Sequence, residues 1–269
     1  MAVTVIGAEG FVGRRLTARL AAVGETPWTP AKGDPALLSR DLGVVYYCAG
    51  LTADYDARPF DTVEAHATQV AALLREGRFE RIVYCSSTRL YDGLAGAAMS
   101  ETARLSLDPA DPRALYDLSK ALGENLVMTR SGGRGRVARL ANVYDWTDGA
   151  PGFLSEWLIR ARAGEELVLQ SSPAIARDYI HLDDAVSALI ALAAAEAPAI
   201  VNVASGELAS NAEIAAVFER AGRPVRFTKQ DAPPPPPAVD IGRLTQLGVR
   251  PRGVREVVAE YLKGEGAQP

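Results

Sequence analysis

The stretch "AVTVIGAEGFVGRRLTARL", residues 2–20, joins a short apolar run, a turn with three glycines and an amphipathic segment. The run at residues 3–6 is apolar and rich in β-branched residues, as in a buried strand. After the glycines, Leu16, Leu20 and Val23 recur at helical intervals. The stretch therefore predicts a strand, a tight turn and a helix, in that order.

The three glycines have the spacing of a phosphate-binding turn. Gly7, Gly10 and Gly13 form a G-x-x-G-x-x-G pattern. The first glycine permits the turn, the second lets the backbone approach a pyrophosphate, and the third lets the helix pack closely on the strand. Backbone N–H groups at the helix start, around Phe11 and Val12, then face the anion. We expect a dinucleotide cofactor, NAD or NADP.

The region that should bind the adenosine ribose carries no acidic residue at the expected place. An acid is expected about 20 residues past the glycines, but Ala31 and Lys32 stand there, with Asp34 slightly beyond. Lys32, together with Arg14 and Arg15, favours a 2′-phosphate and hence NADP. The alternative is that Lys32 is a solvated turn residue.

Further along, apolar β-like runs alternate with helical patterns. Strands are expected near 44–50, 81–88 and 135–144, and helices over 60–77 and 111–130. This alternation predicts βαβ units, and thus an α/β fold with a doubly wound parallel sheet covered by helices on both faces. The proline run in 231–238 predicts an extended surface connector.

Composition excludes several classes of function. The chain has 269 residues, a net charge of −4 and 48% hydrophobic residues, so neither a nucleic-acid partner nor an anionic membrane is expected. No apolar run approaches the roughly 20 residues of a membrane span. Cys48 and Cys85 lie in β-like runs, where we expect reduced core thiols in a cytoplasmic protein. With only two histidines, no metal centre is expected.

Tyr116 and Lys120 stand four positions apart in the helix expected over 111–130. Such a pair is often two surface neighbours. Alternatively, the ammonium lowers the pKa of the phenol, so that Tyr116 exchanges a proton near neutral pH.

Several motifs occur in the order seen in a known family. The segments "GAEGFVG", "YYCAG", "YCSSTRLY", "YDLSK", "RLANVY", "RDYIHLDDAVSAL" and "NVASGE" resemble those of extended short-chain dehydrogenases/reductases, above all the NAD-dependent epimerase/dehydratase group that acts on nucleotide sugars. The resemblance runs from Val3 to about Pro251. It implies a Rossmann-type cofactor domain at 1–145 and a smaller, mainly substrate-binding lobe at 146–269, interleaved with the last elements of the sheet.

The resemblance also implies roles for individual residues. Tyr116 matches the catalytic acid/base, and Lys120 the lysine that lowers its pKa and holds the nicotinamide ribose. Ser87 matches the hydroxyl that binds the reacting sugar oxygen, although Ser86 and Thr88 are close enough to take that place. Other implied contacts are those of Ala49 and Gly50 with cofactor, and of Thr88, Asn142 and Arg177 with substrate.

Two of these assignments have alternatives or exceptions. Arg177 would grip the nucleotide diphosphate, or else form a salt bridge with Asp178 or Asp183. His66 stands where the family commonly has an asparagine, and we expect a buried structural role for it.

The pattern narrows the chemistry without fixing it. The 4,6-dehydratases of this family carry Asp-Glu where this chain has Thr88 and Arg89, which disfavours dehydration. A nucleotide-sugar epimerase is the leading expectation, and an NADPH-dependent keto-sugar reductase is the alternative. A non-catalytic, cofactor-sensing role is less favoured, because Ser87, Tyr116 and Lys120 are all present. The resemblance also implies a homodimer paired through helices near 61–77 and 113–130.

Overall fold

A parallel sheet forms the centre of the molecule. The computed structural model describes residues 2–52, 54–94, 96, 98–196 and 200–264. Its main sheet has the order β1-β2-β3-β4-β8, and every neighbouring pair is parallel. The strands are β1 (Val3–Ile6), β2 (Val44–Tyr47), β3 (Arg81–Ser87), β4 (Gly135–Leu140) and β8 (Ile200–Val203).

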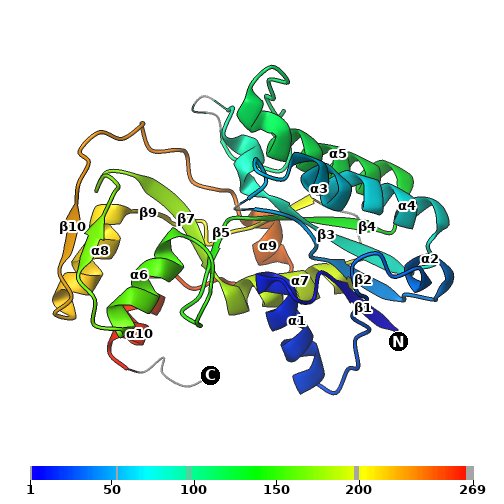
Figure 1. Ribbon diagram of the computed structural model, residues 1–269, viewed down its shortest axis with the longest axis horizontal. Helices are drawn as coiled ribbons and strands as arrows, with labels where there is room; N and C mark the ends of the chain where they lie inside the picture. The colour runs from blue at the N-terminus through cyan, green and yellow to red at the C-terminus, as the bar shows by residue number, and fades with distance from the viewer. Residues whose placement is uncertain (1, 53, 95, 97, 197–199, 265–269) are drawn as a thin grey trace.

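Helices cover both faces of this sheet (Figure 1). On one face, α1 (Phe11–Ala22) packs beside α7 (Leu182–Ala194); on the other, α4 (Gln69–Glu76) packs beside α5 (Leu115–Arg130). Each face has its own apolar core, the first around Leu16 and Leu189 and the second around Leu73 and Val127. Because the strands are covered on both faces, most of their side chains are apolar, although Arg136, Arg139 and Asn202 are buried as well. The predicted doubly wound, Rossmann-type α/β fold is confirmed.

The region between α1 and β2 is shorter than a full βα unit requires. In place of a second strand, Trp28 alone bridges to β1: its N–H donates to the Val3 carbonyl at 2.8 Å and its carbonyl accepts from the Val5 N–H at 2.9 Å. A single-turn helix, α2 (Ala36–Ser39), follows.

The helix expected over 60–77 contains a turn of different geometry. It comprises α3 (Pro59–Val63), a π-helical turn η1 (Glu64–Thr68) and α4. His66 lies inside the π-helical turn. Such turns often mark functional sites. The next helix, α5, is preceded by a 3₁₀ turn, η3 (Pro112–Ala114), with Pro112 at its first position.

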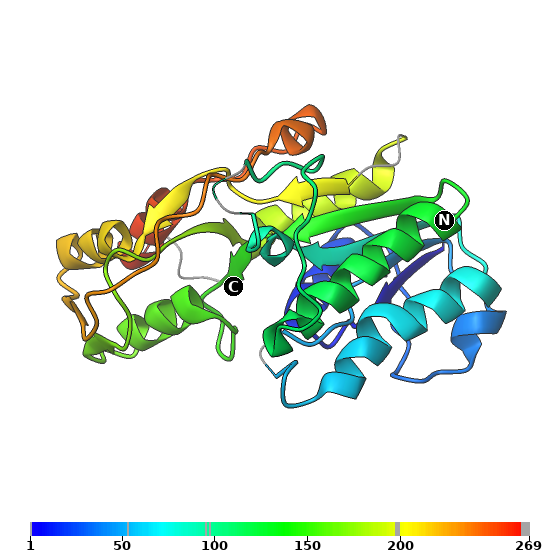
Figure 2. The same ribbon diagram turned by 90° about the horizontal axis from the view of Figure 1, so that it is seen from above.

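A second group of elements lies beside the sheet (Figure 2). The predicted strand 135–144 divides at Ala141, so that β4 stays in the main sheet while β5 (Asn142–Tyr144) pairs with β7 (Ala176–His181). The other strands here are β6 (Leu167–Leu169), β9 (Leu208–Ser210) and β10 (Val225–Phe227), and the helices are α6 (Phe153–Arg162), α8 (Asn211–Arg220) and α10 (Val254–Leu262).

This group has a separate core, with Trp157 and Phe218 at its centre. The proline-rich segment 231–238 carries no helix or strand, and leads from β10 back to α9 (Gly242–Gln246), which packs against β8 (Figure 1). Among the described residues, no helix combines the length and apolarity that a membrane crossing would need.

Candidate active site

The glycine turn lies against the end of β2. Gly7 has φ +83°, and a Cβ built on it would stand 2.6 Å from the amide nitrogen of Ala49. A Cβ on Gly13 would stand 2.2 Å from the carbonyl oxygen of Gly7. Neither position has room for a side chain, so the glycines keep the turn closely packed on the strands.

The start of α1 is suited to an anion. Gly10 is the N-cap residue and supplies no side-chain cap, and no acidic residue stands in the first turn. A 3.0 Å hydrogen bond from the Gly10 N–H to the Gly7 carbonyl closes the turn. The N–H groups at the helix start, near Phe11 and Val12, are therefore hydrogen-bond donors at the positive end of the helix dipole, which favours the binding of a phosphate. These features fit a dinucleotide pyrophosphate.

The cations expected near the adenosine ribose have different surroundings. The side chain of Lys32 is 74% exposed, and its Nζ lies 3.2 Å from Asp61 Oδ1. Arg15 instead forms ion pairs of 2.8 Å with Asp145 and 2.6 Å with Asp183. Two carboxylates from later in the chain therefore hold the guanidinium of Arg15, and its expected contact with a 2′-phosphate stays a prediction.

Ser87, Tyr116 and Lys120 meet at the carboxyl end of the sheet. Ser87 ends β3, and the other two lie in the first turns of α5, which packs on that strand. Tyr116 is 5% exposed. The side chains of Ser87 and Thr52 lie beside its phenol, and both lower its pKa. The structure thus brings together the three residues that the sequence assigned to catalysis.

Burial and nearby charged groups act on the ionisation of Tyr116. Burial raises the pKa of Tyr116, while the hydrogen bond with Ser87 and the positive charge of Arg89 lower it in part. Lys120 lies farther away, with its Nζ 6.0 Å from the centre of the Tyr116 ring. Lys120 donates to the Cys85 carbonyl at 2.8 Å, and burial lowers its pKa to about 8. Of the two cations, Arg89 lies nearer to the centre of the Tyr116 ring, at 5.0 Å.

His66 lies behind the tyrosine ring. Its side chain is fully buried, its Nδ1 lies 2.8 Å from Ser119 Oγ, and its Nε2 accepts from the Leu51 N–H at 3.3 Å. The rings of His66 and Tyr116 pack edge to face at 5.2 Å. Burial, and then the charge of Lys120, lower the pKa of His66 to about 3. The imidazole is thus neutral and buried, which fits the structural role expected for it.

Gly50 follows β2 beside the same groups. A Cβ on Gly50 would lie 2.9 Å from His66 Nε2 and 3.1 Å from Lys120 Nζ. Ala49 and Gly50 therefore border both the glycine turn and the tyrosine cluster.

Two residues beside Tyr116 were missed by the sequence reasoning. Tyr55 and Arg89 pack against the ring of Tyr116, and the amide of Arg89 donates to Ser87 Oγ at 3.1 Å. The available signal was the substitution of arginine for an acid directly after Thr88, which begins the 3₁₀ turn η2 (Thr88–Tyr91).

The predicted substrate residues come from two strands of the second group. Asn142 starts β5 and donates from Nδ2 to the Asp178 carbonyl at 2.9 Å. Arg177, in β7, forms no ion pair within the described part of the chain, and its guanidinium lies 5.7 Å from the centre of the Phe153 ring. Asp178 accepts instead from Ser205 and Gly206. The alternative of a salt bridge from Arg177 to Asp178 or Asp183 is therefore contradicted.

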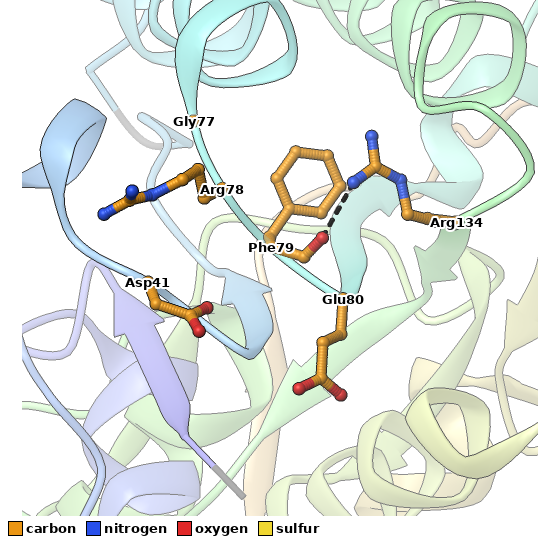
Figure 3. A pocket seen from close by; sticks show the side chains of 6 residues that line it. All are labelled: Asp41, Gly77, Arg78, Phe79, Glu80 and Arg134. Atoms are coloured by element: carbon orange, nitrogen blue, oxygen red, sulfur yellow. Dashed lines mark hydrogen bonds between the residues drawn. The ribbon is translucent and has the colours of Figure 1, made fainter.

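Of two surface hollows in the described part of the chain, one lies near Tyr116 and the other does not. One of about 410 Å³ is bordered by Arg89, Asp92 and Asp117, next to Tyr116. The other, of about 490 Å³, is bordered by Asp41, Arg78, Phe79 and Arg134. Figure 3 shows this second hollow, with the 2.8 Å hydrogen bond from Arg134 to the Phe79 carbonyl. It lies at the amino ends of β2 and β3, whereas open parallel sheets bind ligands at the carboxyl ends.

The two cysteines lie close to each other. Cys48 and Cys85 are free thiols whose sulfur atoms lie 3.7 Å apart. Within the residues that the structure describes, no group of three or more metal-binding side chains occurs.

Comparison with known proteins agrees with this geometry. The model of the NAD dependent epimerase/dehydratase family matches residues 3–204. The chain belongs to this family. The chain is similar in sequence to dTDP-6-deoxy-L-talose 4-dehydrogenase (NAD(P)(+)) from Kitasatospora kifunensis. The two are 31% identical, and the alignment covers 99% of this chain and 96% of the relative.

Solved structures of other proteins share the fold of this family member. MoeE5 in complex with UDP-glucose and NAD has a TM-score of 0.80 at 23% identity, with 98% of each chain covered. RMD from Pseudomonas aeruginosa, complexed with NADPH, has a TM-score of 0.75 at 22% identity, again with 98% of each chain covered. The resemblance to extended short-chain dehydrogenases/reductases is thereby confirmed.

Proposed function

We propose that the protein is an NAD(P)-dependent oxidoreductase that interconverts an alcohol and a ketone on a nucleotide-activated 6-deoxy sugar, as a 4-dehydrogenase or keto-sugar reductase. The observation that carries this proposal is the meeting of Ser87, Tyr116 and Lys120 at the carboxyl end of the sheet, beside the glycine turn. The 31% identical 4-dehydrogenase supports the choice of substrate and reaction.

The chain's own residues divide the work as follows. Ser87 hydrogen-bonds the reacting oxygen of the sugar, and Tyr116 takes the hydroxyl proton in oxidation or returns it in reduction. Lys120, held by the Cys85 carbonyl, keeps a positive charge near the phenol and binds the ribose of the cofactor. A bound nicotinamide dinucleotide would supply the hydride donor or acceptor.

The cofactor is proposed to lie across the glycine turn, with its pyrophosphate at the start of α1 and contacts from Ala49 and Gly50. Lys32 is the group proposed to select NADP, because an exposed pair with Asp61 holds it only weakly. On the substrate side, Asn142, Thr88 and Arg177 are proposed to bind the nucleotide sugar, with Arg177 on the diphosphate. The second group of elements, residues 146–269 in the main, is proposed as the substrate lobe.

Dehydration remains disfavoured for a physical reason. Arg89 stands where dehydratases have an acid, and an arginine side chain keeps its proton throughout the physiological pH range. The epimerase expected from the sequence remains a prediction, since its first half-reaction would need the same three side chains.

A turnover assay tests the proposal. Purified protein would be given dTDP-, UDP- and GDP-sugars and their 4-keto forms, with NADH or NADPH. Consumption of reduced cofactor in proportion to keto-sugar supports the reductase. Inversion of a sugar with no net cofactor change contradicts it in favour of the epimerase, and no reaction across the panel contradicts both.

We also propose a homodimer. Phe60 in α3 is 88% exposed and Leu122 in α5 is 49% exposed, and both lie on the helices expected to pair. Large exposed apolar side chains often mark an interface. Light scattering should give twice the chain mass, and the double variant Phe60→Asp with Leu122→Asp should give one chain mass. Val23→Asp, at an exposed apolar site directly after α1, is the matched control. A monomeric parent protein would contradict the proposal.

A further inference from the structure

The guanidinium of Arg89 lies against two tyrosine rings beside the proposed reaction centre. Its Cζ is 4.8 Å from the centre of the Tyr55 ring and 5.0 Å from the centre of the Tyr116 ring. The two rings are themselves 5.4 Å apart and inclined by 58°. Both Arg89 distances lie within the range of a cation–π interaction.

Hydrogen bonds fix the orientation of this side chain. Nη2 of Arg89 donates to the Tyr55 hydroxyl at 3.0 Å and to the Arg113 carbonyl at 3.1 Å, and Nε lies 3.2 Å from Asp117 Oδ1. The backbone N–H of the same residue donates to Ser87 Oγ at 3.1 Å. Arg89 therefore contacts both hydroxyl-bearing residues of the proposed reaction centre, one through its backbone and the other through its guanidinium.

From this geometry we propose that Arg89 is a positioning residue that holds the ring of Tyr116 and stabilises its phenolate form. The inference rests on the proposed function, because it assumes that Tyr116 transfers the proton. A guanidinium suits this role because it keeps its charge and its flat face stacks on aromatic rings. Position 89 thus places a positive charge on the face of the Tyr116 ring. The dehydratases have a negatively charged residue at this position.

Other charged and titratable groups also face Tyr116. From α5 come Lys120, 6.0 Å from the ring centre, and Asp117; from η1 comes the neutral His66; from the loop before α3 comes Tyr55; and Asp92 lies beside Arg89. Asp117 opposes the phenolate, since its charge raises the pKa of Tyr116. Burial raises the pKa of Asp117 to about 6, and the charge of Arg89 lowers it in part. Arg89 therefore offsets a carboxylate that would otherwise disfavour the phenolate at neutral pH.

The test measures the ionisation of Tyr116 without any sugar substrate. 3,5-Difluorotyrosine is incorporated at position 116, and its ¹⁹F resonance is followed against pH with NAD⁺ or NADP⁺ bound. Fluorine withdraws electrons from the ring and brings the titration into an accessible range. The variants are Arg89→Met and Arg89→Gln, which remove the charge, and Arg89→Lys, which keeps it. Arg113→Gln is the matched control, because Arg113 is 83% exposed and its guanidinium pairs with Asp111.

We expect the titration midpoint to move to higher pH in both neutral variants, to move less in Arg89→Lys, and to stay in place in Arg113→Gln. A midpoint unchanged in Arg89→Met and Arg89→Gln overturns the inference, and so does an equal shift in Arg113→Gln. Since no sugar is present, this result is independent of the substrate assay above. Once a substrate is found, kcat/KM for alcohol oxidation at pH 7 should fall about tenfold in Arg89→Met, while cofactor affinity stays the same.

Discussion

The ammonium of Lys120 donates a 2.8 Å hydrogen bond to the backbone carbonyl of Cys85, inside strand β3. The sheet, rather than Tyr116, therefore sets the position of this charge. Because Lys120 is also 5% exposed, its charged form is desolvated, and the pKa falls to about 8 from the ordinary 10.5. This arrangement has a measurable effect on stability.

Replacing Lys120 should stabilise the protein in a pH-dependent way. Below pH 8 the buried lysine is charged in both the folded and unfolded states, so folding carries the full desolvation penalty, at most about 3 kcal/mol. As pH rises from about 8 towards 10.5, the folded protein loses the proton first and the penalty is relieved. Lys120→Met should therefore melt above the parent at pH 7, with a smaller difference at pH 10.

The control for this measurement is Lys229→Met, which removes an exposed lysine. Its melting temperature should differ from that of the parent by the same small amount at both pH values. A Lys120→Met difference that does not change between pH 7 and pH 10 would contradict the prediction.

Tyr116→Phe should abolish turnover while keeping the cofactor. The proton donor is lost, and positioned acid–base groups contribute at least about a hundredfold to rate. The ring that packs on Tyr55 and His66 remains, so a fluorescence titration should give an unchanged Kd for NAD(P)H. Tyr144→Phe, which removes a buried hydroxyl in the separate core around Trp157, is the control. Turnover retained in Tyr116→Phe would exclude the proposed chemistry.

Gly7 and Gly24 have nearly the same φ, so variants at these two positions distinguish backbone strain from the effect of close packing. Gly7 and Gly24 have φ of +83° and +86°, but a Cβ on Gly24 would have no heavy atom within 4 Å, whereas one on Gly7 would meet Ala49. Gly24→Ala should lose about 1 kcal/mol, the ordinary cost of a side chain at positive φ, and keep cofactor affinity. Gly7→Ala should melt at a lower temperature than Gly24→Ala and lose at least about tenfold in affinity for NAD(P)H. Equal behaviour of the two variants would show that the contact with Ala49 is unimportant.

Lys32→Ala should weaken NADPH selectively. If its ammonium binds a 2′-phosphate, the Kd for NADPH should rise roughly tenfold, as expected for one charge-assisted hydrogen bond, and the Kd for NADH should stay the same. Asp61→Asn frees Lys32 from its 3.2 Å ion pair and should not weaken NADPH. Calorimetry with both cofactors measures these dissociation constants for the parent and the two variants. Equal losses for NADH and NADPH in Lys32→Ala would identify Lys32 as a solvated turn residue.

The ion pair between Glu124 and Arg139 is buried one turn beyond Lys120 on α5. Its shortest distance is 2.6 Å, both side chains are at most 5% exposed, and Arg139 also donates to the Tyr91 hydroxyl at 2.8 Å. Either Glu124→Gln or Arg139→Met should destabilise the protein by about 3–5 kcal/mol, because a buried charge loses its partner. The double variant should lose less than the sum, as measured by urea unfolding. Additive losses would contradict coupling between the two groups.

Much of the fold could be predicted because its signals are local. The strand, turn and helix of residues 2–20 follow from apolar spacing and three glycines, and the tyrosine and lysine of α5 share one turn. The contacts that were missed join distant segments. Arg15 pairs with Asp183, 168 positions away, and Arg89 stacks on Tyr55 and Tyr116 from a different element. The spacing of apolar residues along the sequence does not predict such contacts.

The shortened region between α1 and β2 contains a second feature that the sequence does not predict. Here a single residue, Trp28, pairs with β1, and this pairing depends on hydrogen bonds that the sequence does not encode locally. Likewise, the π-helical turn at His66 inserts an extra residue into an otherwise regular pattern, and its buried hydrogen bond with Ser119 comes from another helix.

The chain passes more than once between the main sheet and the second group of elements, which limits how the protein can be cut into fragments. The chain leaves the main sheet at Ala141, returns for α7 and β8, leaves again, and comes back through the proline-rich segment to α9. A fragment ending at residue 145 would lack α7 and β8, so it would expose the face of β4 that α7 covers and the edge of β4 that pairs with β8. The second group of elements therefore cannot be exchanged by a single crossover, and a chimera must carry several junctions at once.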